Sequence, residues 1–197
     1  AITITDAVTD VDCNAASTGA VDITVSGGSP AYSFNWDNGA TSEDLSNVVA
    51  GTYCVTVTDF FGCTAAGCAT VSEPSVLTAT ASKVDVDCNG NSTGSIDLSV
   101  VGGTSPYTYV WNNAATTEDL ANIPDGTYDV TVTDALGCTV SASATITEPA
   151  ILTSSTSQVN VDCNGNSTGS VNLTVAGGTT AYSYNWSNGS TTEDLLG

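Results

Sequence analysis

The 197-residue chain has no histidine, no methionine and one basic residue, Lys83, against 21 acidic residues. Its formal net charge of −20 excludes a surface that binds a nucleic-acid backbone, because nothing in the chain could neutralise the phosphates. The same charge argues against docking on anionic lipid. No run of about 18 apolar residues occurs, so we expect no segment that inserts into a membrane. The charge also predicts strong self-repulsion, which keeps an exposed protein soluble.

The absence of histidine also decides how a possible nucleophile motif is interpreted. Residues 90–94 and 165–169 match the pattern Gly-x-Ser-x-Gly, with Ser92 and Ser167 at the centre. That pattern marks a catalytic serine only on a strand-to-helix turn with a histidine partner. Both segments join two expected strands, so the sequence predicts no enzymatic activity.

What the chain does contain is an internal repeat with a step of 75 residues. The residues that keep this step are Cys13, Cys88 and Cys163, Trp36, Trp111 and Trp186, and the pairs Glu73-Pro74 and Glu148-Pro149. A fixed period of this kind indicates a repeat array. We therefore expect one domain at 1–75, a second at 76–150, and a partial third at 151–197 that lacks its last two strands.

The sequence starts at a repeat boundary, has neither a signal peptide nor a starting methionine, and stops inside a repeat. We therefore expect it to be a segment of a longer mature polypeptide. A unit of this size buries a modest core, and it usually needs covalent staples or neighbouring units for stability.

Within the second repeat, apolar and polar residues alternate in short runs separated by turn residues. Alternation over 77–81 and 84–88, with a slip between them, predicts an edge strand with a bulge or break. Further strands are expected at 96–100, 107–111, around Leu120, 128–132 and 140–146, with a hairpin turn at 134–138. Turn signals every 8–12 residues predict an all-β fold of tandem β-sandwiches. Trp111 and Tyr128 stand where immunoglobulin-like sandwiches place a core tryptophan and a tyrosine corner.

These residues carry a family resemblance along the whole chain. The ordered motifs are Cys-Asn-Gly, Gly-Ser-Ile-x-Leu, Gly-Gly-x-x-Pro-Tyr-x-Tyr-x-Trp, Gly-Thr-Tyr-x-Val-Thr-Val-Thr-Asp-x-x-Gly-Cys and a closing Glu-Pro. The series resembles the SprB-type repeat of giant surface adhesins in gliding Bacteroidota, which the type IX secretion system exports, and it is similar to PKD-type immunoglobulin-like domains. The resemblance implies an extracellular, cell-surface, non-catalytic filament. The first repeat departs from the pattern, with Ala15-Ala16 in place of Gly-Asn and an extra pair, Cys54 and Cys68.

Seven cysteines in repeats of this secreted kind favour disulfides over a zinc site. Zinc needs tight Cys or His pairs, and only Cys63-x4-Cys68 comes close. If the strands pair as a hairpin about Phe61, Cys54 lies opposite Cys68 and both side chains point outward. We therefore predict a cross-strand bridge between Cys54 and Cys68.

The remaining cysteines, which are Cys13, Cys63, Cys88, Cys138 and Cys163, allow two pairings. Within a repeat, Cys13 would join Cys63, and Cys88 would join Cys138. In a PKD-like sandwich, however, the two loops concerned lie at opposite ends of a strand of about ten residues, roughly 33 Å long. Disulfide Cα atoms lie within about 7 Å of each other. A bridge from one repeat to the next, Cys13 to Cys138, is therefore favoured, and the other three cysteines would pair outside this sequence.

Acidic residues near the repeat junction are candidate calcium ligands. Asp85 and Asp87 begin a pattern that resembles half of a calcium-binding loop, because oxygen ligands at alternate positions suit Ca²⁺. The pattern has Ile96 where such a loop requires a glutamate, which excludes a complete loop of that kind. A partial site that uses Asp10, Asp12 and Glu73 with Asp134 of the next repeat stays open. The alternative is a solvated acidic loop.

Together these features predict structural stalk repeats of a long extracellular adhesin filament, involved in surface attachment or gliding. The expected partners are neighbouring repeats of the same chain or filament, and surface polysaccharide. One alternative is an array of carbohydrate-binding modules, which would need exposed aromatic residues. Tyr107, Tyr109 and Trp111 share one face of a strand and are expected in the core, which disfavours that alternative. The other alternative is a filament of separate subunits completed by strand exchange.

Overall fold

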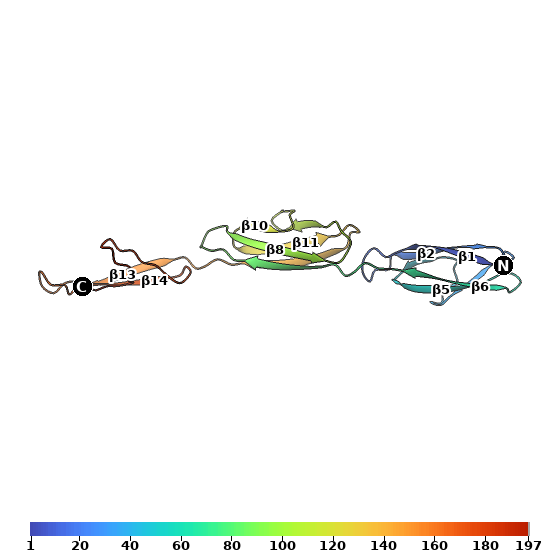
Figure 1. Ribbon diagram of the computed structural model, residues 1–197, viewed down its shortest axis with the longest axis horizontal. Helices are drawn as coiled ribbons and strands as arrows, with labels where there is room; N and C mark the ends of the chain where they lie inside the picture. Colours follow the sequence, from blue (N-terminus) through green and yellow to red (C-terminus); the bar gives the residue numbers. More distant parts are fainter. Residues whose placement is uncertain (197) are drawn as a thin grey trace. The chain divides into compact units, whose positions relative to one another are not determined.

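Alternating side chains and frequent turns produce an all-β chain. The computed structural model describes residues 1–196, and every regular element in that range is a β-strand (Figure 1). No helix in the described part is long and apolar enough to span a membrane. The predicted all-β fold class is therefore confirmed. The two complete repeats, described next, have the predicted sandwich arrangement.

The first repeat contains six strands in two three-stranded sheets. The strands are β1 (Thr3–Thr9), β2 (Gly19–Ser26), β3 (Ser33–Trp36), β4 (Leu45–Val48), β5 (Gly51–Thr58) and β6 (Thr64–Val71). One sheet has the order β1-β2-β4 and the other β3-β5-β6, and the two lie as separate layers (Figure 1). Alternate residues of the strands point between the layers and form the core, in which Val21, Ile23, Trp36 and Val57 are at most 4% exposed.

The second repeat continues with the same arrangement of strands. They are β7 (Thr78–Val84), β8 (Gly94–Val101), β9 (Thr108–Trp111), β10 (Leu120–Ile123), β11 (Gly126–Thr133) and β12 (Thr139–Ile146). Their sheets have the orders β10-β8-β7 and β12-β11-β9. The third repeat forms one sheet, from β13 (Thr153–Val159), β14 (Ser170–Ala176) and β15 (Leu195–Leu196).

The chain divides into two compact units. The first comprises Ala1–Thr80, Ser99–Thr116 and Val130–Ala142. The second comprises Ala81–Leu98, Thr117–Asp129 and the chain from Ser143 onward. The first unit therefore contains the whole first sandwich together with β9 and the turn that joins β11 to β12.

The first strand of the second repeat differs from the prediction. The sequence predicted a bulge or break between Ala81 and Val84, but β7 runs without interruption to Val84. The alternation of apolar and polar residues changes here because the chain leaves the sheet β10-β8-β7 after Val84. The N–H of Val86 donates to Thr147 O at 3.0 Å, beyond the end of β12, and the Val86 side chain is buried. Val11 makes the same crossing in the first repeat, where its N–H donates to Ser72 O at 3.1 Å.

The expected immunoglobulin-like features are present. Trp36 and Trp111 are each 2% exposed, and the indole N–H of Trp36 donates to Ser42 O at 2.9 Å. The Tyr128 hydroxyl donates to Pro124 O at 3.1 Å, which is the geometry of a tyrosine corner. Burial, together with the charge of Asp125, raises the pKa of Tyr128.

Candidate functional site

The feature with the clearest chemical consequence begins at the turn between β11 and β12, residues 134–138. Its first residue, Asp134, is 5% exposed, and its Oδ1 accepts hydrogen bonds from the N–H groups of Leu136 and Cys138 at 3.0 and 2.9 Å. Its Oδ2 accepts a third, from Thr104 N at 2.9 Å. Burial alone would raise the pKa of Asp134, but these backbone donors stabilise the carboxylate and hold its pKa below the ordinary value. The carboxylate thus fixes the turn that carries Cys138.

Cys13 stands on a loop that is held just as closely. The N–H of Ala16 donates to Cys13 O at 2.9 Å, and the N–H of Asp12 donates to Thr18 Oγ1, also at 2.9 Å. Glu73, at the end of the first repeat, accepts a hydrogen bond from Ala15 N at 2.7 Å through Oε2. The Glu-Pro pair that recurs in the sequence therefore holds the cysteine loop against the last strand of its own repeat.

The structure brings this turn and this loop together in a disulfide. Cys13 and Cys138 are bonded, with their Cα atoms 5.7 Å apart, and the Cys138 sulfur lies 3.3 Å from Asp12 O. The alternative pairing within the first repeat, Cys13 with Cys63, is not formed. Cys63, Cys88 and Cys163 are free and exposed in the structure.

A second disulfide joins Cys54 of β5 to Cys68 of β6, with a Cα separation of 4.0 Å. The two residues lie directly opposite each other in the antiparallel ladder. Tyr53 faces Ala69 and Val55 faces Gly67, as expected for a hairpin about Phe61. This bridge closes one hairpin of the first repeat.

The candidate calcium ligands make separate hydrogen bonds within the protein instead of converging on one point. Asp10 Oδ1 accepts from Ser72 N at 2.7 Å, and Asp85 Oδ1 accepts from Thr147 N at 2.8 Å, each at a strand crossing. Asp87 Oδ1 accepts from Thr93 Oγ1 at 2.6 Å and from the side chain of Asn91. Asp12 contributes its backbone to the Cys13 loop, and Glu73 and Asp134 have the partners given above. Within residues 1–196, no three Cys, Asp or Glu side chains are grouped so that they could hold a metal ion.

A comparison with protein families identifies the family of this chain. A model described as the SprB repeat matches it three times, at residues 5–41, 80–116 and 155–191, which together make up more than half of its length. The chain belongs to the SprB repeat family. Each match contains one cysteine loop and one tryptophan, at the same 75-residue step. SprB repeats are extracellular and surface-associated, and the two disulfides fit an oxidising environment.

Three solved structures are similar to these SprB repeats at low sequence identity. The three N-terminal domains of the bacteriophage RB49 highly immunogenic outer capsid protein are 17% identical, with a TM-score of 0.50 over 92% of this chain and 71% of that one. A structure of Dscam is 14% identical, with a TM-score of 0.33 over 74% of this chain and 45% of that one. The amphioxus IgVJ-C2 molecule is 15% identical, with a TM-score of 0.31 over 72% and 96%. No curated protein matches the chain.

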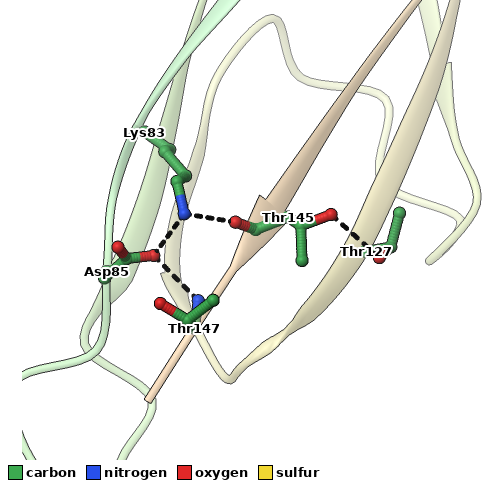
Figure 2. Close-up of polar contacts among 5 residues, drawn as sticks. All are labelled: Lys83, Asp85, Thr127, Thr145 and Thr147. Atoms are coloured by element: carbon green, nitrogen blue, oxygen red, sulfur yellow. Dashed lines mark hydrogen bonds and ion pairs between the residues drawn. The ribbon is translucent and has the colours of Figure 1, made fainter. Parts of the chain in front are cut away.

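The single basic side chain of these SprB repeats reinforces a strand crossing. Lys83 Nζ lies 2.8 Å from Asp85 Oδ1 and donates to Thr145 O of β12 at 2.5 Å (Figure 2). The hydrogen bond from Lys83, with that from Thr147 N, lowers the pKa of Asp85. The first repeat has Val8 at the equivalent position and retains only the Asp10 contact. Lys83 is therefore an addition to a crossing that works without it.

One recurring acid was not singled out from the sequence. Asp44, Asp119 and Asp194 each accept a hydrogen bond at 2.9 Å from the backbone N–H of a residue on the neighbouring strand, namely Ile23, Leu98 and Leu173. The recurrence of Glu-Asp-Leu at a 75-residue step was the available signal.

The glycines of the Gly-x-Ser-x-Gly segment have structural roles. Gly90 adopts a positive φ of 78°, where a side chain would be strained. Gly94 begins β8, and a Cβ added there would lie 2.8 Å from Ile146 Cγ2 and 2.9 Å from Ile123 O. The motif thus reflects a left-handed turn followed by close packing between strands.

Aromatic residues of the third repeat line an open hollow beside β13 and β14. Tyr182, Tyr184 and Trp186 border an open cavity of about 630 Å³ together with Leu173 and other residues of β13 and β14. Their counterparts in the first repeat, Tyr32, Phe34 and Trp36, belong to its core or pack against it. The residues around the cavity therefore correspond to those that form the core in the first repeat.

Proposed function

We propose that this chain is a stalk segment of a long extracellular adhesin filament, which serves surface attachment or gliding. In this proposal the SprB repeats add length to the filament and act as spacers. The chain has no histidine, and the buried carboxylates of Asp59 and Asp134 accept hydrogen bonds from backbone N–H groups. The proposal therefore includes no catalytic activity, and it includes export by the type IX system of a Bacteroidota cell.

The observation that carries this proposal is the Cys13–Cys138 bridge. It joins a loop of the first SprB repeat to a turn of the second, in addition to the peptide that links them. A covalent staple between successive domains has little use in a freely flexible linker. It suits a fibre that must transmit tension, because load can pass through the bridge while individual strands separate.

The experiment that tests the proposal uses cells that carry the full protein. Antibodies raised against this chain should label extended surface fibres in electron microscopy. Deletion of the repeats should abolish attachment or gliding without slowing growth. Labelling confined to the cytoplasm, or normal attachment after deletion, would overturn the proposal.

Electrophoresis under reducing and denaturing conditions separates this proposal from subunit assembly. A stalk made of one polypeptide runs as a single very large chain. A filament of separate subunits completed by strand exchange would instead yield small subunits of uniform size.

A further inference from the structure

We propose that Asn89-Gly90 is a site of spontaneous deamidation, and that hydrogen bonds to Glu148 control how fast it reacts. In this reaction the backbone nitrogen of the residue after an asparagine attacks the carbon of the side-chain amide. A glycine at that place favours the attack, because it has no side chain to crowd the ring that forms and its backbone is flexible. Gly90 meets this requirement, with a φ of 78° and no atom beyond its chain neighbours within 4 Å of the position that a Cβ would take.

A single carboxylate holds both groups that react. Glu148 Oε2 accepts a hydrogen bond from Gly90 N, the attacking nitrogen, at 2.7 Å. Glu148 Oε1 accepts one from Asn89 Nδ2, the nitrogen that leaves, also at 2.7 Å. Asn89 Nδ2 donates in addition to Pro149 O at 3.1 Å. These three hydrogen bonds are called the Glu148 lock below.

The Glu148 lock opposes the reaction in two ways. Ring closure requires the Asn89 amide carbon to move over Gly90 N, and this movement breaks the hydrogen bonds that Asn89 Nδ2 makes to Glu148 and to Pro149 O. The amide anion that attacks would also form beside the Glu148 carboxylate, and a neighbouring like charge disfavours it. Asn89 therefore reacts mainly in molecules whose lock has opened, and its rate reports the fraction of open molecules.

Water is the only co-reactant. Gly90 N forms a bond to Asn89 Cγ and loses its proton, the Cγ–Nδ2 bond breaks, and ammonia leaves with that proton. The product is a cyclic succinimide. Water then opens the ring at one of its two carbonyl carbons, which leaves either an aspartate at position 89 or its isoaspartate isomer. No group is oxidised or reduced.

Deamidation prevents the lock from forming again. The new carboxylate would stand where Asn89 Nδ2 now donates to Glu148 Oε1. A carboxylate has acceptors only, so the hydrogen bond is lost and the two like charges repel each other. The residue before Asn89 is Cys88, whose backbone O accepts from Asn91 N at 3.1 Å in the same loop. The modification therefore loosens the cysteine loop of the second repeat irreversibly, and it marks molecules whose lock has been open.

The first repeat has a similar lock without the reactive dipeptide. Ala15 N donates to Glu73 Oε2 at 2.7 Å, and Asn14 Nδ2 donates to Pro74 O at 3.2 Å. Ala15 has a φ of 60°, close to that of Gly90. Its methyl group, however, crowds the attacking nitrogen. Asn14 is therefore a matched position of low reactivity within the same chain.

The test follows deamidation in the full chain at neutral pH, with a peptide map that resolves the asparagine, aspartate and isoaspartate forms. Glu148→Ala removes the lock and should speed the loss of Asn89 about tenfold, which corresponds to about 1.4 kcal/mol of opening free energy. Glu148→Gln can accept from Gly90 N but cannot hold Asn89 Nδ2 in the same way, so it should react at an intermediate rate.

Two matched controls accompany these variants. Asn38-Gly39 makes its hydrogen bonds within its own turn, so its rate should not respond to substitution of Glu148. Glu73→Ala opens the lock of the first repeat and should leave Asn14 slow, whereas Glu73→Ala combined with Ala15→Gly should make Asn14 reactive.

Denaturant separates the lock from a direct chemical effect of Glu148. The unfolded chain has no lock, so Glu148→Ala and the unsubstituted chain should then lose Asn89 at the same rate. Melting curves show which variants are folded at the assay temperature, and Glu148→Gln alone decides the outcome if Glu148→Ala is not. A folded variant that reacts no faster than the unsubstituted chain would overturn the proposal, as would a difference that persists in denaturant.

The consequence of the reaction is tested with Asn89→Asp. This variant should have a lower melting temperature than the unsubstituted chain. Combining it with Glu148→Gln should recover most of the loss, because the glutamine amide can donate to the new carboxylate. A combination no more stable than Asn89→Asp alone would refute repulsion between the two carboxylates as the reason why the lock stays open.

Discussion

The Cys13–Cys138 bridge leads to a quantitative prediction about mechanical extension. The bonded residues are 125 apart in the sequence but have Cα atoms only 5.7 Å apart. When the chain is pulled from its two ends, the bridge carries the load past everything between them. An extended chain spans about 3.5 Å per residue, so the bridge hides about 440 Å of contour length. The Cys54–Cys68 bridge lies inside this region and closes a smaller loop within it, with a sequence separation of 14.

The perturbation is Cys13→Ser combined with Cys138→Ser, and the assay is single-molecule stretching without reductant. The fully unfolded variant should be about 390 Å longer than the unsubstituted chain, because only the Cys54–Cys68 loop of about 45 Å stays closed. Added reductant should release that remaining length in the variant and the whole hidden length in the unsubstituted chain. Cys88→Ser is the matched control and should leave the length unchanged. Equal unfolded lengths with and without the Cys13–Cys138 pair would refute the load path.

The remaining predictions concern local contacts. Lys83→Val, which installs the residue found at Val8, should change the melting temperature little, because exposed ion pairs contribute little to stability; a large drop would show that the crossing depends on the lysine. Ala15 has a φ of 60°, so Ala15→Gly should raise the free energy of unfolding by about 1 kcal/mol, while Gly90→Ala should lower it by a similar amount; shifts of equal sign in denaturant titrations would contradict this. Asp134→Asn should lower the melting temperature at pH 7. Because the pKa of Asp134 is lower in the folded state than its ordinary value of 3.8, its contribution is complete above that value and is lost as the pH falls through the folded pKa. The deficit of the variant should therefore shrink as the pH falls below 3.8, and a deficit that stays constant in acid would exclude this origin.

Several features of the fold could be predicted because they depend on counting along the chain. The two-residue period of the strands places Trp111 and Val130 inside, and the hairpin register places Cys54 opposite Cys68. The choice of Cys138 as the partner of Cys13 followed from comparing the length of a strand with the reach of a disulfide.

The positions of hydrogen bonds between distant segments could not be counted in this way. The slip in alternation near Val84 was visible, but a bulge and a crossing to another sheet leave the same pattern in the sequence. Acidic residues near Cys13 suggested calcium because their charge is visible and their backbone partners are not. Asp85 is committed to Thr147, which lies 62 residues away and reaches it only through the paired strands. Local periodicity thus determined the strands, and tertiary folding determined the roles of the carboxylates.

The presence of one basic side chain in the whole chain has a consequence for proteolysis. Trypsin-like proteases select Lys or Arg through an acidic pocket, and in this sequence only Lys83 meets that requirement. Lys83 lies within β7, with its ammonium group hydrogen-bonded to Asp85 and to the backbone of β12 (Figure 2). A protease would have to release both the strand and the side chain before cleavage. Both complete repeats would therefore survive such enzymes outside the cell, where a surface fibre is constantly exposed to them.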